Sequence, residues 1–488
     1  MKKIENIKIE KLIFGGQGLA HVDDKVVFVW NALPGEIVDI EIVKKKKDYL
    51  EAIAINIVEA SPERVEPKDK HFLSTSPWQI MSYETENKWK KEISIETYKK
   101  LGGSVFENID PEIIFPQEEY GYRNKMEYSF AEIENPLLPA RRTGGRGADT
   151  TEECRGVFAD IGQHTPPLRV CPSQEGIFSL AFFERGKKNK FPIEKSELAD
   201  PIINQTAKEV LDWINKQGLE RRNLKTLIIR SDGKGNSISA LFIKDEIEFK
   251  DYPKLNKNNL GFQVYYSTHK CPASVPTKLL YSEGQDFLIA DLITHPLHPR
   301  RTGSPSLENR GGDYSTKLKF GLLSFFQVHI PIFTKALIDI TKHIEPNTEI
   351  IDFYSGVGSI GLPLAKNQTK VTLVDNNEEA ILYAKENIKL NKLDNCEAHC
   401  IPAEKMTDII TKDKTIVLDP PRAGLHGDVT KKLLEVEPLK IIYLSCNLST
   451  QARDVKILGE KYKITFSRLY NFFPRTPHVE GLVVLERK

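Results

Sequence analysis

One cysteine near the C-terminus has the setting of a nucleophile. Cys446 lies in "IIYLSCNLST" (441–450), where an apolar run gives way to polar residues that favour a turn. A thiol in such a place can attack an electrophilic carbon once it is ionised. A lone cysteine is more often a small buried residue, because free cysteines are among the most buried residue types. Cys446 by itself therefore favours the structural interpretation, and its neighbours must decide between the two.

Carboxylates stand at the ends of neighbouring apolar runs. Asp375 ends "TLVD", Asp419 ends "TIVLD", and Glu480 begins "EGLVVL" after the stiff loop "FFPRTPHV". A carboxylate that opens an apolar strand, as Glu480 does, must be paired or functional, because burial of a lone charge is costly. Asp419 precedes two prolines, which an ordinary strand-to-loop turn could also carry. His478, in the loop, is typical of a structural hydrogen-bonding residue.

A Gly-x-Gly turn precedes these carboxylates, in "DFYSGVGSIGLPLA" (352–365). Gly356 and Gly358 allow a tight turn and the close approach of a ligand to the backbone. Asp375 follows about 20 residues later, where an acidic residue can bind a ribose diol, although it could equally cap the next helix. The combination fits NAD, FAD or S-adenosylmethionine. Gly361 completes a formal G-x-G-x-x-G, so an NAD-dependent oxidoreductase is a weak alternative.

The elements around these residues predict how they are brought together. From about residue 320, short apolar runs alternate with helical segments such as "EEAILYAKENIKLN". This pattern is typical of a parallel sheet covered on both faces, in which ligands bind at the carboxyl ends of the strands. The last pieces, "KITFSRLYNFFP" and "VEGLVVLERK", lack a helix between them and predict a hairpin at one edge of the sheet.

The rest of the chain divides into two further regions. Residues 1–60 alternate glycine-rich turns with Val/Ile runs and predict a small antiparallel barrel. The run "KKKKDY" is predicted to be the tip of a hairpin. It would be either a solvated loop or a contact to RNA phosphates. Residues 65–318 predict a mixed α/β domain with a helix over 84–101. Two aperiodic Gly/Pro/Arg-rich stretches, 134–178 and 295–315, are interpreted as surface insertions, with RNA contact as the minor alternative.

The composition limits the class of protein. The 488 residues are 40% hydrophobic and 28% charged, as in a soluble protein of two to four domains. Six cysteines in this length do not form a disulfide framework, and no signal peptide or membrane span is evident, so we expect a cytoplasmic protein. The net charge of +1 means that a nucleic-acid partner would need local basic patches.

Four motifs together resemble one family. "DPPRAG" is followed after sixteen residues by "IIYLSCNLST" and then by "FPRTPHVE", while "SFFQVH" (324–329) precedes the sheet. The set resembles the RNA uracil-5-methyltransferases over nearly the whole chain outside the insertions. Residues 1–60 resemble a TRAM domain, an RNA-binding module of the ribosomal-RNA members. The resemblance implies an OB-like β-barrel, a central α/β domain (65–318) and a doubly wound, class I (Rossmann-like) S-adenosylmethionine-dependent methyltransferase domain (319–488), in a monomer.

The resemblance also implies roles for the residues above. Cys446 would attack C6 of a uracil ring, and Glu480 would remove the C5 proton after methylation. Arg422 and Asp419 would lie near the ring, and Asp419 could orient the base or touch the cofactor. The residues that would hold S-adenosylmethionine are Gln327, Tyr354, Gly356, Gly358, Ser359, Asp375 and Asp419. Tyr354 replaces a common Phe, and Ser359 replaces a common Asn.

One family feature is missing from this sequence. Many relatives hold an iron–sulfur cluster with four cysteines of the central domain, but the matching stretch "DKHFLSTSPWQIMSY" (69–83) has none, and Ser196 stands near the fourth position. We therefore expect no iron–sulfur cluster. We also expect no other metal, since Cys154 and Cys171 lie in an insertion and Cys396 and Cys400 in a predicted strand.

The function expected on these grounds is the formation of 5-methyluridine in RNA, with 23S ribosomal RNA as the favoured substrate because of the barrel. Methylation of transfer RNA at U54 is an alternative. A protein that binds RNA without catalysis is another, although it would have no need of the nucleophile, the base and the glycine turn together. Methylation of a uridine in structured RNA requires that its base leave the stack. Trp78, Tyr83 and Trp89 could stack on RNA bases, or they could be ordinary core residues.

Overall fold

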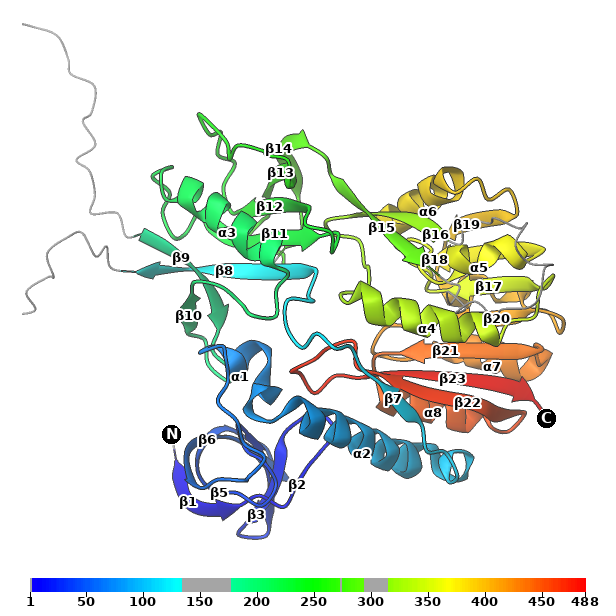
Figure 1. Ribbon diagram of the computed structural model, residues 1–488, viewed down its shortest axis with the longest axis horizontal. Helices are drawn as coiled ribbons and strands as arrows, with labels where there is room; N and C mark the ends of the chain where they lie inside the picture. Colours follow the sequence, from blue (N-terminus) through cyan, green and yellow to red (C-terminus); the bar gives the residue numbers. More distant parts are fainter. Residues whose placement is uncertain (1, 134–176, 273, 294–314) are drawn as a thin grey trace, which may run out of the picture.

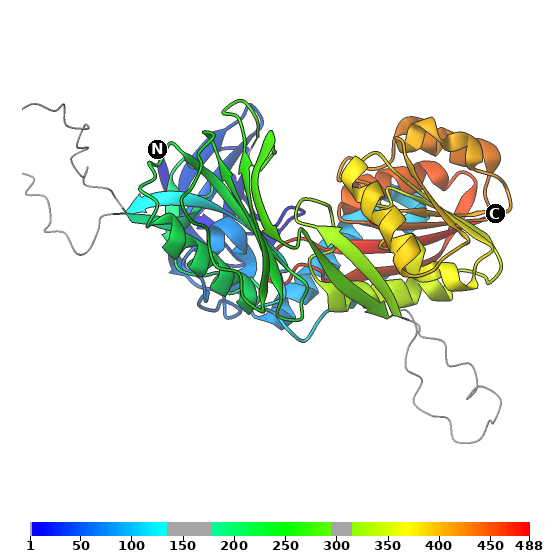
Figure 2. The same ribbon diagram turned by 90° about the horizontal axis from the view of Figure 1, so that it is seen from above.

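The computed structural model describes residues 2–133, 177–272, 274–293 and 315–488 (Figure 1). Within these ranges the strands form a six-stranded, a seven-stranded and an eight-stranded sheet and a separate two-stranded hairpin. The six- and seven-stranded sheets lie at one end of the molecule and the eight-stranded sheet at the other (Figure 2). In this described part, no helix is both long and apolar enough to cross a membrane.

The N-terminal strands curl into a closed, barrel-like sheet. They are β1 (Lys3–Lys8), β2 (Lys11–Leu12), β3 (Gly18–Val22), β4 (Lys25–Trp30), β5 (Ile37–Lys45) and β6 (Tyr49–Glu59), in the order β1-β5-β6-β4-β3-β2. "KKKKDY" is the tip of the β5–β6 hairpin, as expected. The expected all-antiparallel pairing is wrong for one pair, because the chain turns back through β5 and lays β6 parallel to β4.

The seven-stranded sheet carries the middle of the chain. Its strands are β8 (Lys125–Ile133), β9 (Ile177–Phe183), β10 (Lys190–Ile193), β11 (Leu224–Ser231), β12 (Ser237–Ile243), β13 (Asn259–Tyr266) and β14 (Lys278–Gly284), in the order β10-β9-β8-β11-β12-β13-β14. Helix α3 (Pro201–Ile214) packs on β9, β11 and β12. The predicted insertion 134–178 lies outside the described residues except for its last two, which begin the apolar strand β9.

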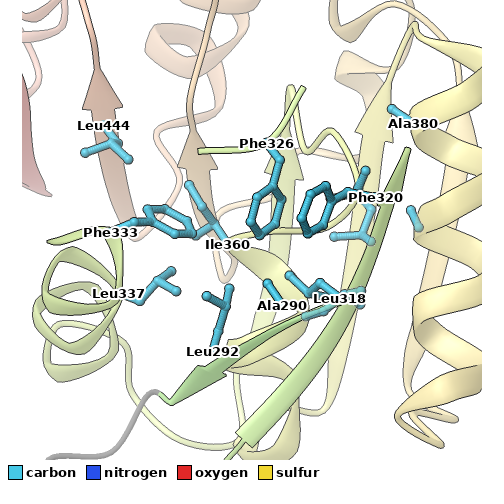
Figure 3. Close-up of a cluster of buried hydrophobic side chains, with 14 of the residues drawn as sticks. Ala290, Leu292, Leu318, Phe320, Phe326, Phe333, Leu337, Ile360, Ala380 and Leu444 are labelled. Carbon is cyan, nitrogen blue, oxygen red and sulfur yellow. The ribbon is translucent and has the colours of Figure 1, made fainter. Parts of the chain in front are cut away.

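A two-stranded hairpin links this sheet to the C-terminal region. Strands β15 (Phe287–Ile293) and β16 (Ser315–Gly321) pair antiparallel, and the predicted insertion 295–315 between them lies outside the described residues except for Ser315. The hairpin packs on α4 (Ile330–Lys342) and α6 (Glu378–Leu390). Figure 3 shows its residues Leu292 and Phe320 in one core with Phe333 of α4 and Leu444 of the large sheet.

The eight-stranded sheet has the predicted doubly wound form. Its strands are β17 (Glu349–Phe353), β18 (Lys370–Asp375), β19 (Cys396–Cys400), β20 (Thr415–Leu418), β21 (Lys440–Ser445), β22 (Tyr462–Tyr470), β23 (Glu480–Arg487) and β7 (Glu112–Ile114), in the order β19-β18-β17-β20-β21-β23-β22-β7. The connecting helices include α5 (Gly361–Leu364), α6, α7 (Gly427–Val436) and α8 (Leu448–Leu458). Strands β19 to β21 are parallel, and β23 returns antiparallel to β21.

Two elements from the predicted middle region belong to this sheet instead. Helix α2 (Tyr83–Gly102) packs along α8, and β7 pairs with β22 outside the β22–β23 hairpin. The hairpin was therefore predicted correctly, but β7 and not the hairpin forms the edge of the sheet. The short elements α1 (Phe72–Thr75), η1 (Pro77–Ile80) and η2 (Gly103–Phe106) flank α2. Helix α2 runs beneath the sheet toward the barrel (Figure 1).

Candidate active site

Strand register brings Cys446 and Glu480 face to face. Ser445 at the end of β21 pairs with Gly481 near the start of antiparallel β23. One position further along each strand, Cys446 is therefore opposite Glu480. Residues that oppose each other in an antiparallel pair have Cβ atoms about 4.5–5.5 Å apart. Cys446 is half-buried, and Glu480 is 3% exposed. The two residues that sequence reasoning assigned as nucleophile and base are thus neighbours.

Burial favours the neutral forms of the acids in this site. The pKa of Glu480 is raised well above its usual value by burial and by nearby Asp419, and its buried Oε2 has no hydrogen-bond partner. The pKa of Asp419 rises to about 7 through burial. Burial, with the charges of Glu480 and Asp419, raises the pKa of the Cys446 thiol to about 12. Burial thus shifts all three groups toward their neutral forms.

Arg422 is a cation that opposes the effect of burial on the pKa values of Cys446 and Glu480. It hydrogen bonds the Cys446 thiol, and its charge lowers the pKa values of both Cys446 and Glu480 against the effect of burial. The Arg422 carbonyl accepts hydrogen bonds from Asn447 Nδ2 at 2.8 Å and Thr450 Oγ1 at 3.3 Å. Asn447 also caps α8 by accepting from Ser449 N at 3.2 Å. Asn447 thus ties the Arg422 loop to the residue that follows the cysteine, a role that its sequence position alone did not suggest.

Gln451 connects the strand that ends at Cys446 with the strand that begins at Glu480. Its buried amide donates to Tyr443 O and to Gly481 O, each at 2.9 Å, and accepts from the Tyr98 hydroxyl at 2.6 Å. A Cβ at Gly481 would lie 2.2 Å from the Tyr98 hydroxyl, so the glycine lets helix α2 approach this point. Sequence reasoning missed Gln451, because its partners come from three separate elements.

Helix α2 also holds the loop that leads into β23. Glu86 and Lys90 form a 2.8 Å ion pair with both side chains fully buried. Lys90 Nζ donates to Asn471 Oδ1 at 2.5 Å and to Phe473 O at 3.0 Å. Glu86 accepts from the backbone N–H of Arg475, at 2.9 Å, where φ is +65°. These contacts offset the backbone strain at a residue in the left-handed region and fix the loop before Glu480.

The glycine turn lies between β17 and α5, with Asp375 beside it. Asp375 Oδ2 accepts from Gly356 N at 2.9 Å, and Oδ1 accepts from Asn377 N at 2.8 Å. Gly356 has φ +54°, and a Cβ there would meet nothing within 4 Å, so the backbone faces open space. Gly358 has φ +86°, and a Cβ there would lie 2.6 Å from Leu362, so the turn needs a glycine at this position.

Asp352 lies beneath this turn and was not among the predicted residues. It is fully buried: Oδ2 accepts from Gly361 N at 2.8 Å, whereas Oδ1 has no partner. Burial raises the pKa of this carboxyl well above its usual value, with Asp419 and Asp375 adding to the effect. The aspartate inside the apolar run "EIIDF" was the signal that sequence reasoning could have used.

The remaining predicted cofactor residues lie around the same strand ends. Gln327 Nε2 is 3.4 Å from Asp419 Oδ2, so the "SFFQVH" segment reaches the end of β20. Tyr354 follows β17 with φ +62°, and Ser359 is buried in the turn after Gly358. The predicted set is therefore distributed over one edge of the sheet, from the glycine turn after β17 to the Asp419 loop after β20.

A cavity of about 140 Å³ opens beside the cysteine. Its walls come from the loops that carry Arg422, Cys446 and His478, from α2 and from the barrel, and they also include Lys90 and Phe14. The His478 ring faces the cavity. His478 is exposed at the surface, yet partial desolvation and the charges of Arg422, Lys90, Arg123 and Arg185 lower its pKa. The Arg422 side chain places a cation on the wall of the same cavity.

The stretch 69–83 and Ser196 lie together in a buried polar cluster. Gln79 Nε2 donates to Asp69 Oδ2 at 2.8 Å and to Ser76 Oγ at 2.6 Å, and Glu197 N donates to Asp69 Oδ1 at 3.1 Å. Among the described residues, no group of three or more His, Cys, Asp or Glu side chains is arranged to hold a metal ion. The expected lack of an iron–sulfur cluster stays a prediction. Trp78 is buried, with 2% of its surface exposed.

Comparison with known proteins gives concordant matches for the two ends of the chain. Residues 323–488 match the family described as tRNA (Uracil-5-)-methyltransferase, and residues 3–55 match the TRAM domain. A curated protein of Bacteroides thetaiotaomicron named uncharacterized RNA methyltransferase is 27% identical over 96% of this chain and 99% of its own length. One of the same name from Lactobacillus johnsonii is 28% identical, covering 99% of this chain and 98% of its own length.

A solved structure has the same fold over the whole chain. It is the Pyrococcus abyssi tRNA (uracil-54, C5)-methyltransferase in complex with S-adenosyl-L-homocysteine, with 21% identity, a TM-score of 0.68, and coverage of 99% of this chain and 100% of that one. The match establishes the order of the barrel, the middle sheet and the large doubly wound sheet as a known architecture.

Proposed function

We propose that this protein is an RNA methyltransferase that forms 5-methyluridine, with Cys446 as nucleophile and Glu480 as base; the match of residues 323–488 to the tRNA (Uracil-5-)-methyltransferase family supports the proposal. The observation that carries the proposal is the opposition of these two side chains at the ends of β21 and β23, with Arg422 hydrogen bonded to the thiol. A structural cysteine would require neither the buried carboxyl nor the cation.

The glycine turn fits S-adenosylmethionine. The backbone at Gly356 faces open space, Asp375 lies beside it at the end of β18, and the buried Asp352 Oδ1 lacks a partner. Asp375 would bind the ribose hydroxyls, and Gln327 and Asp419 would lie toward the sulfonium end, nearer the cysteine. When bound, S-adenosylmethionine supplies the methyl group as an electrophile.

The residues of the chain supply the other half of the chemistry. The Cys446 thiolate adds to C6 of the uracil, and the C5=C6 π electrons move toward O4, so that C5 becomes nucleophilic. Arg422 lowers the free energy of the thiolate because it hydrogen bonds the sulfur. Once C5 carries the methyl group, ionised Glu480 removes the C5 proton, the C5=C6 bond re-forms, and the C6–S bond breaks to release the thiolate. A buried carboxyl of raised pKa is a stronger base than an exposed one.

The mechanism can be tested by blocking its last step, the removal of the C5 proton and the release of the thiolate. Glu480→Gln should accumulate a covalent protein–RNA adduct with S-adenosylmethionine and an unmodified transcript, because elimination requires the base. Cys446→Ser should form neither the adduct nor 5-methyluridine. The matched control is Glu460→Gln, a surface position outside the site. Mass spectrometry of the trapped peptide should place the RNA on Cys446, and methylation by Cys446→Ser at the wild-type rate would refute the mechanism.

For the substrate we favour 23S ribosomal RNA: residues 3–55 match the TRAM domain, and the family resemblance of the sequence associates that domain with ribosomal-RNA members. Transfer RNA is the second candidate, supported by the similarity of the whole chain to a tRNA (uracil-54, C5)-methyltransferase. Separate transcripts of both RNAs substituted with 5-fluorouridine distinguish them, since fluorine at C5 cannot leave as a proton and the adduct persists. An adduct with transfer RNA alone would overturn the ribosomal assignment and leave the mechanism intact.

A further inference from the structure

The turn between β2 and β3 of the barrel forms a wall of the catalytic cavity. Ile13, Phe14 and Gly15 line the same cavity as Cys446 and Arg422. The turn is closed by hydrogen bonds from Ile13 N to Gln17 O at 3.0 Å and from Gly16 N to Ile13 O at 2.9 Å. A segment more than 400 residues away in sequence is thus built against the nucleophile.

Specific contacts hold this turn in place. The Gly16 carbonyl accepts from Trp78 Nε1 at 3.0 Å, and Trp78 N donates to Arg475 O at 3.2 Å in the loop before Glu480. Gly16 has φ +92°, and a Cβ there would lie 2.4 Å from Pro477 Cβ. Because only glycine permits both the conformation and the approach, the turn packs directly on the catalytic loop.

Apolar packing fixes the barrel at the same place. Leu12 and Leu33 of the barrel share a buried cluster with Trp78 and with Ile93 of α2. The Lys11–Glu96 ion pair, at 2.6 Å, lies outside this cluster. The turn therefore stands in a fixed position relative to α2 and the cysteine, as a rigid wall would.

Phe14, at the tip of this turn, lies outside the buried apolar clusters of the barrel. It is 45% exposed, yet it lines the cavity. A large exposed aromatic side chain near a cation is the arrangement by which proteins hold single-stranded nucleotides: the bases stack on the ring and the cation binds a phosphate. Arg422, which lines the same cavity as Phe14, supplies such a cation.

We propose that the barrel turn 13–17 is part of the active site and that Phe14 is the stacking platform for the nucleotide next to the target uridine. The inference rests on the proposed function and names the part of the RNA that the barrel binds. A uridine that leaves its stack exposes the face of its neighbour, and Phe14 covers that face. Phe14 is a positioning residue, since the chemistry belongs to Cys446 and Glu480.

The test uses the full chain. Its substrate is whichever transcript, ribosomal or transfer RNA, the wild-type enzyme methylates. Phe14→Ala should raise the KM for that transcript about tenfold to hundredfold, the range expected for one lost base stack, and leave the KM for S-adenosylmethionine unchanged. Phe14→Trp should restore the wild-type value. Ile55→Ala is the matched control, because Ile55 is also 45% exposed on the barrel but does not line the cavity.

A second measurement reports stacking itself. With 2-aminopurine placed beside the target uridine, wild-type and Phe14→Trp enzymes should quench its fluorescence on binding, and Phe14→Ala should not. Equal kinetics and equal quenching in Phe14→Ala and Ile55→Ala would overturn the inference. Failure of the wild-type enzyme to methylate either transcript would instead overturn the proposed function, so the two failures are distinguishable.

Discussion

Gln451 provides a sharp test of how the site is held together. Replacement by leucine keeps the approximate volume but removes the amide that donates to Tyr443 O and Gly481 O and accepts from Tyr98. These bonds join β21, β23 and α2 just behind the Cys446–Glu480 pair. We expect Gln451→Leu to lower both the stability of the protein and kcat.

The size of the effect follows from burial. Gln451 and Tyr98 are buried, with 0% and 1% of their surfaces exposed, so solvent cannot replace a missing partner. Each buried polar group left without a partner costs about 1–3 kcal/mol. Three such groups with partial relaxation give a loss of about 3–6 kcal/mol in the free energy of unfolding. Tyr98→Phe removes only one partner of Gln451 and should cost about 1 kcal/mol.

Urea unfolding and steady-state kinetics check this prediction together. Gln451→Leu should be the least stable of the three proteins, Tyr98→Phe should be intermediate, and the wild type should be the most stable. The KM for S-adenosylmethionine should stay the same, because the glycine turn is on the other side of β20. If Gln451→Leu is as stable as wild type, or is destabilised but keeps its full kcat, then Gln451 does not position the catalytic pair.

Three further predictions concern charge and backbone. Arg422→Ala should shift the pH dependence of Cys446 alkylation upward by about one unit, because the loss of a neighbouring cation raises the thiol pKa; an unchanged profile would contradict the assigned contact. Asp419→Asn should raise the melting temperature at pH 8 but hardly at pH 4. The pKa of Asp419 in the folded protein is about 7, above the usual 3.8, so the stability that the neutral acid gives is lost as the pH rises through 7. Asparagine stays neutral at both pH values and avoids this loss. Gly358→Ala should weaken S-adenosylmethionine binding in calorimetry, since its Cβ would lie 2.6 Å from Leu362 at a φ of +86°.

The sequence alone was sufficient to predict the large sheet and to place Cys446 and Glu480 at neighbouring strand ends. Continuous apolar runs separated by helices are typical of one architecture, and parallel strands end at one edge, so Asp375, Asp419 and Cys446 had to be neighbours. Glu480 was identifiable because a carboxylate seldom opens an apolar strand. These inferences depend on local pattern and on the topology that the pattern dictates.

The supporting residues could not be found in this way. Gln451 and Asn447 read as ordinary polar residues of a helix start, and their partners lie on other elements. Strand β7 has only three residues, too few for a periodic signal, and pairs with a strand about 350 positions away. The net charge of +1 gave no sign of the cations around His478. Such features arise from tertiary contacts, which local preferences do not encode.

The site therefore depends on the N-terminal half of the chain as much as on the sheet. Glu86 and Lys90 are charges buried with no exposed surface on their side chains, which is costly unless their partners are in place. Those partners are Asn471, Phe473 and Arg475, the backbone and side chains of the loop that carries the chain to Glu480. The same loop contacts Trp78 and the barrel turn, so displacement of the barrel would disturb the position of Glu480. If Glu480 is the base and the barrel turn holds RNA, as we propose, binding and chemistry are coupled through this loop and α2.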